Sequence, residues 1–230
     1  GLLFAIATGM AIGYAIERFT IRPLAGRPAL TKVVVTIGWL LVLQTAAGLI
    51  WGDTAYHRPV QLVARKGFRF FGTGVTVGYD QLTTFLVAIG LALAAAIVLR
   101  RTTFGASMRA VADDPVAARL WGVNVNRVTA ASWMAGSAMA ALAGVLITPM
   151  VNFTTFALTL IVIDAFTAAL IGRLASLPMT VVGAMFLGIA QTYPRAFSNN
   201  AGISQLVTFI LVLVVLGVLF RPGSRKVRLA

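Results

Sequence analysis

One carboxylate in this sequence lies where its chemistry demands an explanation. Asp164 sits within the apolar run Leu160–Phe166, and a charged side chain inside a bilayer costs at least about 2.5 kcal/mol. Three explanations are open: Asp164 faces a pathway for a polar cargo, it pairs with Arg173, or it lies at the membrane interface because its span begins later. A proton relay through Asp164 would need a second ionisable group inside the membrane, and the apolar runs contain none.

Catalytic chemistry has no support elsewhere in the sequence. The phosphate-binding pattern G-x-x-x-x-G-K-[ST] does not occur, nor do H-E-x-x-H or G-x-S-x-G. Six acidic residues, one histidine and no cysteine are too few to build a metal centre. We therefore expect no catalytic residue, no metal site and no cofactor, and we expect that the protein is not an enzyme.

The polar segment 100–127 carries clear helix signals. Thr103–Ala112 is predicted to form a short helix. Asp114 followed by Pro115 is typical of an N-cap and a first helical residue, and Gly122 is well placed to end the turn. The segment therefore predicts two short helices between membrane spans.

The second of these helices, Pro115–Trp121, is expected to present an apolar patch. Val116, Leu120 and Trp121 can form that patch outside the membrane. A partner protein that docks on the patch is one interpretation. The alternative is a helix that rests passively on the lipid headgroups.

The composition indicates what positions these residues. The 230 residues are 59% hydrophobic and 11% charged, with a mean hydropathy of +0.92, whereas soluble domains are about 25% charged. A bilayer is crossed by about 20 apolar residues, so the sequence predicts an all-α, polytopic transmembrane bundle of about seven spans, with an error of one. The predicted spans are Gly1–Ile16, Val33–Trp51, Gln81–Leu99, Val128–Met150, Phe156–Gly172, Pro178–Thr192 and Ser204–Phe220. The fifth and sixth are short enough to be tilted, broken or re-entrant.

The basic residues orient these spans. There are 19 Lys and Arg against six Asp and Glu, an excess also typical of nucleic-acid binders. If the C-terminus is cytoplasmic, fourteen of the 19 fall on the cytoplasmic side, which follows the positive-inside rule and gives no support to a nucleic-acid partner. Loop 100–127 is then cytoplasmic and loop 52–80 external, with Arg65–Phe71 as a small folded or interface-lying element. We expect one transmembrane domain over 1–230 that lacks its N-terminal part, because Gly1 already lies in an apolar run.

Four motifs are spread over residues 17–223. The first is Glu17-Arg18-x-x-x-Arg22-Pro23-Leu24-x-Gly26, followed by Leu30 and Thr36-Ile37-Gly38. The second, which is the specific one, is Arg101-Thr102-x-x-Gly105-x-x-x-Arg109-Ala110-Val111-Ala112, continued by Asp114-Pro115-x-Ala117-Ala118-Arg119-Leu120-x-Gly122-Val123-Asn124-Val125-x-Arg127. The third runs from Ala165-Phe166-Thr167-Ala168-Ala169 to Gly172, and the fourth is Leu219-Phe220-Arg221-Pro222-Gly223. With these motifs the chain resembles the membrane-spanning permease subunits of branched-chain amino acid ABC transporters.

The resemblance implies that the second motif contacts an ATPase, with segment 115–121 as a cytoplasmic coupling helix. The implied coupling residues are Gly105, Arg109, Ala110, Ala117, Ala118, Leu120 and Gly122, to which Asp114 is added as the helix cap and Trp121 as part of the apolar patch. The implied partners are two ABC ATPase subunits, a second permease subunit in a homo- or heterodimer, a periplasmic substrate-binding protein and the lipid of the bacterial inner membrane.

The function implied is a translocation pathway for branched-chain or other hydrophobic amino acids, with Asp164, Thr36 and Gly38 as pathway candidates. The chain departs from the family's usual pattern at 172–179, at Asp164 and at Gln191, and these departures bear on the cargo more than on the fold. Urea or a short amide is therefore an alternative cargo. An ion-coupled secondary transporter and a purely structural membrane protein are the alternatives from other classes.

Overall fold

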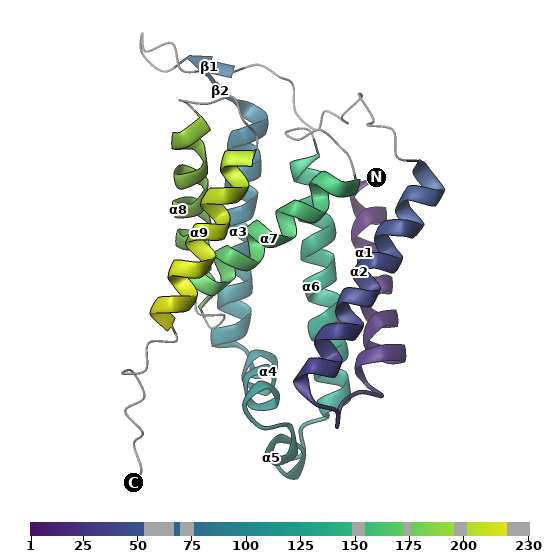
Figure 1. Ribbon diagram of the computed structural model, residues 1–230. Coiled ribbons are helices and arrows are strands. Elements are labelled where there is room, and N and C mark those ends of the chain that lie inside the picture. Colours follow the sequence, from purple (N-terminus) through teal and green to yellow (C-terminus); the bar gives the residue numbers. More distant parts are fainter. Residues whose placement is uncertain (53–66, 70–75, 149–154, 173–175, 196–201, 220–230) are drawn as a thin grey trace. The chain divides into compact units, whose positions relative to one another are not determined.

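The computed structural model describes residues 1–52, 67–69, 76–148, 155–172, 176–195 and 202–219, and these residues are almost entirely helical (Figure 1). They divide into two compact units, Gly1–Leu158 and Thr159–Ala230. The two units are described separately below.

The first unit contains four long helices and two short ones. The long helices are α1 (Leu2–Ile16), α2 (Ala29–Trp51), α3 (Tyr79–Arg101) and α6 (Val125–Ile147), and α1 continues into one π-helical turn, η1 (Glu17–Ile21). The short helices α4 (Thr103–Asp113) and α5 (Pro115–Leu120) lie between α3 and α6, at one end of the unit (Figure 1). The predicted cytoplasmic helices are thus confirmed as helices, although the second ends at Leu120 and leaves Trp121 as its C-cap.

The described residues of the second unit form three helices. These are α7 (Thr155–Ile171, whose first turn belongs to the first unit), α8 (Leu177–Arg195) and α9 (Gly202–Leu219). Together with the long helices of the first unit, they give a helix for each of the seven predicted spans.

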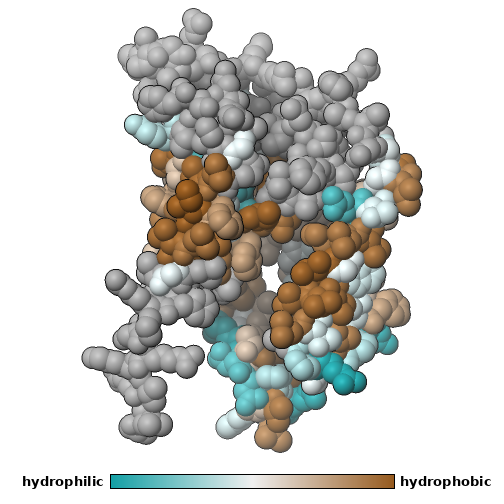
Figure 2. All heavy atoms as spheres, in the orientation of Figure 1, coloured by the Kyte–Doolittle hydropathy of each residue, from teal (hydrophilic) through white to brown (hydrophobic). Residues whose placement is uncertain are grey.

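Among the described residues, four stretches are long and apolar enough to cross a bilayer: Leu2–Ile21, Leu30–Trp51, Gln81–Arg101 and Val125–Ile147. Within the described parts of α7, α8 and α9 the apolar stretches are shorter. On the face that Figure 2 shows, hydrophobic side chains cover α2 and the described part of the second unit, and hydrophilic ones gather at the end of the first unit that carries α4 and α5. The chain therefore has the surface of a polytopic membrane protein, while the count of seven crossings stays a prediction.

One small sheet departs from the all-α expectation. Strands β1 (Gly67–Arg69) and β2 (Thr76–Gly78) pair in antiparallel fashion, with Phe68 opposite Val77. They fall in the predicted external loop, where Phe68, Thr76 and Val77 have the β propensity that a short ribbon needs. The remainder of the predicted element, including Arg65, lies outside the described residues.

Glycines allow α1 to pack directly on α6. A Cβ atom added at Gly9 would lie 2.7 Å from Cβ of Ala141, and one added at Gly13 would lie 2.7 Å from the carbonyl oxygen of Trp133. Such close approach is how membrane helices gain packing energy when lipid gives no hydrophobic preference. This pair forms the scaffold against which the end of the unit is arranged.

Candidate functional site

Helix α5 is held by a cap at each end. The Asp114 side chain accepts hydrogen bonds from the backbone N–H groups of Val116 (2.8 Å) and Ala117 (3.1 Å). At the other end Gly122 adopts φ +80°, and the N–H of Val123 reaches the carbonyl of Ala118 at 3.0 Å. This is a Schellman motif, which favours glycine because its backbone is left-handed. A helix of only six residues is stable here because its ends are satisfied.

The side chains of α5 divide into an anchored face and an exposed face. Ala118 is buried, whereas Val116, Leu120 and Trp121 are 66%, 85% and 88% exposed. The predicted apolar patch is therefore present and uncovered in this chain. Because large apolar side chains outside an apolar span gain by losing contact with water, the patch is suited to a second surface.

Helix α4 is fixed to the end of α3 at its base. Gly105 is buried, and a Cβ added there would collide with the carbonyl oxygens of Val98 and Leu99. The guanidinium of Arg109 donates a hydrogen bond to the carbonyl of Leu99. Carbonyl groups at a helix C-terminus lack partners within the helix and favour a cationic donor. Gly105 and Arg109 thus set the angle between α3 and α4.

The coupling residues implied by resemblance therefore separate into two groups. Ala110, Leu120 and Trp121 are exposed and available to a partner. The others shape the loop or are partly covered: Gly105, Arg109, Asp114, Ala117, Ala118 and Gly122.

A partly buried ion pair lies at the junction of α1 and α2. Arg22 donates from Nε to Oε1 of Glu17 at 3.2 Å and from Nη2 to Oε2 at 3.0 Å, and Glu17 is only 1% exposed. The π-helical turn brings them together, because the N–H of Arg22 bonds to the carbonyl of Glu17 five residues back. Trp39 then donates to the Thr20 hydroxyl at 2.9 Å, which ties α2 to the same turn.

From the sequence, Glu17 and Arg22 were recognised only as parts of the first motif and not as an ion pair. Their five-residue spacing does not match the three- or four-residue spacing of an α-helical pair, so the pairing could not be read from α-helical periodicity.

Asp164 lies in a polar cluster made by the three helices of the second unit. Gln191 on α8 donates from Nε2 to Oδ1 of Asp164 at 2.8 Å and to the hydroxyl of Thr208 at 2.6 Å. Thr208 on α9, which is 3% exposed, donates to the same Oδ1 at 2.9 Å. The partners of the carboxylate that the structure describes are thus neutral side chains. Arg173, one of the suggested partners, lies outside the described residues.

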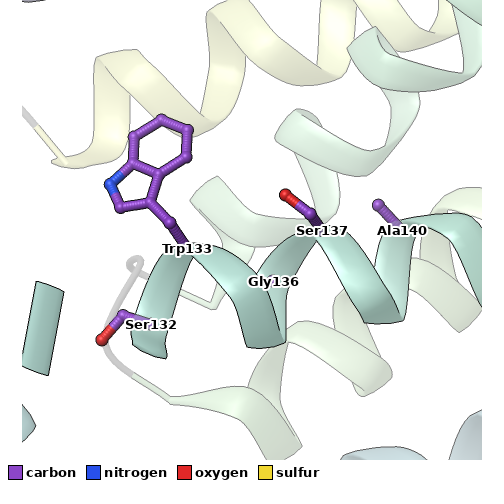
Figure 3. Close-up of a pocket in the computed structure, with 5 residues that line it drawn as sticks. All are labelled: Ser132, Trp133, Gly136, Ser137 and Ala140. Carbon is purple, nitrogen blue, oxygen red and sulfur yellow. The ribbon is translucent and has the colours of Figure 1, made fainter. Parts of the chain in front are cut away.

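The other two pathway candidates have little around them. The Thr36 hydroxyl donates to the carbonyl of Val33 within its own helix at 2.8 Å, and Gly38 has open space where a Cβ would stand. An open groove of about 370 Å³ runs along α6 elsewhere in the unit. Figure 3 shows Trp133 and Ser137, two of the residues that line it, extending from α6. That groove is lined by one helix and presents no cluster of charged groups.

Residues 1–216 match the family described as the branched-chain amino acid transport system permease component. The chain belongs to this family. LivH from Escherichia coli K12, a permease protein of a high-affinity branched-chain amino acid transport system, is 32% identical over 99% of this chain and 76% of its own length. The Pseudomonas aeruginosa permease BraD of the same named system is 31% identical over 97% of this chain and 75% of its own length.

More distant relatives carry other cargo names. The fructose import permease protein FrcC from Rhizobium meliloti is 26% identical over 93% of this chain and 61% of its own length. No solved structure matches the chain significantly. Membership is therefore shown by sequence, and the cargo is not fixed by it.

The permease is a multi-pass membrane component of an ABC transport system and is not itself catalytic. Among the residues that the structure describes, no group of three or more His, Cys, Asp or Glu side chains could hold a metal ion.

Proposed function

We propose that this permease forms part of the translocation pathway of an ABC importer for branched-chain or other hydrophobic amino acids. The observation that carries the proposal is the 32% identity with LivH over 99% of the chain. Its named relatives BraD and LivH both serve branched-chain amino acid transport. Separate ATPase subunits drive the importer, a periplasmic binding protein delivers the cargo, and a second permease completes the pathway.

The orientation follows from charge. With seven crossings and a cytoplasmic C-terminus, fourteen of the 19 Lys and Arg residues lie on the cytoplasmic side. Loop 100–127 then faces the cytoplasm, where ATP is available, and loop 52–80 faces the binding protein. Thr36 and Gly38 stay candidates for the pathway between the two sides.

Segment 100–127, which contains α4 and α5 and is called the α4–α5 loop from here on, supplies the coupling to the ATPase. An ATPase that buries Leu120 and Trp121 displaces water from two large apolar side chains, worth roughly 1.5–3 kcal/mol for each that is fully covered. Because Asp114 and Gly122 hold α5 and Arg109 holds α4 to α3, a movement of the docked ATPase is passed to α3 as a rigid-body displacement. The loop thus joins nucleotide hydrolysis to the spans.

The cargo is tested with the cognate binding protein. Its equilibrium binding of leucine, urea and fructose is measured side by side, and the complete importer is then assayed for uptake in proteoliposomes. We expect tight binding of leucine and ATP-dependent leucine uptake. Binding of urea or fructose in preference to leucine would replace the cargo while leaving the importer class intact.

The driving force is tested separately. The permease alone is reconstituted in liposomes without nucleotide and with an imposed ion gradient. We expect no uptake above that of empty liposomes. Gradient-driven uptake by the permease alone would contradict the ABC mechanism and favour a secondary transporter.

A further inference from the structure

The second unit is held at two levels. Near the end of α7, a Cβ added at Gly183 on α8 would lie 2.8 Å from Cβ of Ile171 and 3.0 Å from the carbonyl oxygen of Ala168. These contacts set the spacing of α7 and α8 by backbone approach. The second level lies at Gln191, which is eight residues further along α8, or about 12 Å at 1.5 Å per residue.

At that second level the contacts are polar and join all three helices. One oxygen of Asp164 accepts from both Gln191 and Thr208, and Gln191 also donates to Thr208. The three groups therefore form a closed triangle with one corner on each of α7, α8 and α9. Van der Waals packing tolerates a helix sliding along its neighbour, whereas a closed hydrogen-bond triangle fixes the register of all three helices.

The triangle needs an acceptor at Asp164, and neither donor carries a charge that would pair with a carboxylate. Both donors are neutral, and both converge on Oδ1. The amide oxygen of an asparagine occupies the same position and accepts the same two bonds. A leucine has the same branched shape but accepts neither bond, so Gln191 and Thr208 lose the acceptor that they share and keep only the bond between them.

We propose that Asp164, Gln191 and Thr208 form a polar clasp that sets the register of α7, α8 and α9, and that Asp164 acts in it as a hydrogen-bond acceptor. Asp164 is then a positioning residue and does not supply charge to a cargo or proton. The proposal concerns helix register and holds for any cargo; only the uptake readout below rests on the proposed function. Failure of the clasp is distinguishable from failure of the proposed function, because wild-type uptake decides the latter.

The experiment compares Asp164→Asn, Asp164→Leu and Thr208→Val in the complete importer. Thr192→Val is the matched control, because Thr192 is exposed on α8 and its hydroxyl bonds only to Gly188 of its own helix in the described structure. Thermal stability of the purified complex and ATP-driven uptake between pH 6 and 8 are measured for each variant. Thr208→Val keeps the side-chain shape and serves as the milder lesion if Asp164→Leu does not assemble.

The clasp predicts that Asp164→Asn and the control keep uptake within about twofold of wild type, with an unchanged pH profile and midpoint of thermal unfolding. Thr208→Val is expected to lower both stability and uptake, by about fivefold for uptake, and Asp164→Leu to lower them further. Loss of uptake in a stable Asp164→Asn complex, or a shifted pH profile, would overturn the proposal because it would require charge. Wild-type behaviour of both Asp164→Leu and Thr208→Val would overturn it as well.

Discussion

The α4–α5 loop and the Asp164 cluster show opposite arrangements of polar and apolar side chains. In the loop, which lies outside the apolar spans, the backbone is capped at Asp114 and Gly122 while Leu120 and Trp121 are exposed. In the cluster, which lies among apolar helices, polar side chains are turned toward one another. Apolar side chains in water cost free energy unless another surface covers them, and polar side chains among apolar helices cost free energy unless they are hydrogen-bonded.

What satisfies each region differs. The cluster is satisfied from within, since Gln191 and Thr208 provide the hydrogen bonds that Asp164 accepts. The loop satisfies its backbone but not its apolar surface, and a permease of an ABC system has a partner that can cover it. Polar groups in an apolar region therefore indicate internal contacts here, and apolar groups in a polar region indicate an external one.

The largest effect is expected from the base of the loop. Gly105→Ala places a methyl group against the carbonyls of Val98 and Leu99, so we expect it to destabilise the permease by about 1–3 kcal/mol. Thermal unfolding in detergent measures the change. Gly90→Ala is the control, because Gly90 lies within α3 with open space around it, and it should leave stability unchanged or slightly raised. Equal behaviour of the two variants would contradict the tight α3–α4 junction.

The second effect tests whether the ion pair between Glu17 and Arg22 stabilises the first unit, as hydrogen bonds within the cluster are expected to stabilise the second. Glu17→Ala leaves Arg22 without its bidentate partner, and we expect a loss of about 2 kcal/mol, below the usual 3–5 for a buried pair because Arg22 is partly exposed. Arg18→Ala, at an exposed neighbouring position, is the control. An unfolding midpoint equal to that of the control would mean that the ion pair contributes nothing.

A further variant separates the patch from the folding of the loop. Trp121→Asp should weaken ATPase association by at least tenfold, or about 1.4 kcal/mol, while the midpoint of thermal unfolding stays unchanged, because the side chain is 88% exposed. Asn126→Asp adds the same charge at an exposed site near the start of α6 and should not weaken association. If both variants bind the ATPase like wild type, the patch is not the docking surface.

The smallest effect concerns the cap. Asp114→Ala removes the acceptor for two N–H groups of α5, so we expect a loss of about 1 kcal/mol of helix stability and a severalfold drop in ATP-driven uptake. Asp114→Ser keeps a capping oxygen and should restore most of the uptake. A serine variant as impaired as the alanine variant would point to a role for the carboxylate beyond capping.

Local signals in the sequence were enough to predict much of this architecture. Apolar runs of bilayer length predicted the long helices, because a helix satisfies its own backbone in lipid and needs about 20 apolar residues to cross it. The Asp114-Pro115 pair and Gly122 predicted the short helix, since caps depend on adjacent residues. The helix ends differ by a few residues because backbone hydrogen bonding continues past the last apolar side chain.

Long-range contacts could not be predicted in this way. The partners of Asp164 are 27 and 44 residues away, and the sequence does not state which faces of three apolar helices meet. The contact of Arg109 with the end of α3 depends likewise on the angle at Gly105. Gln191 in the sixth predicted span and Thr208 in the seventh were the available signal for partners of Asp164. Gln191 was noted only as a departure from the family's pattern, and Thr208 was not singled out.

Single-cysteine cross-linking shows whether the exposed patch on α5 receives the ATPase. The chain contains no cysteine, so Leu120→Cys introduces one thiol into the patch, and Leu49→Cys introduces one at a comparably exposed site on α2, since Leu49 is 83% exposed. With a short cross-linker and the assembled importer, Leu120→Cys is predicted to give a covalent adduct with the ATPase subunit, and Leu49→Cys none. A complex that transports normally but yields no adduct at position 120 would contradict docking of the ATPase on this patch.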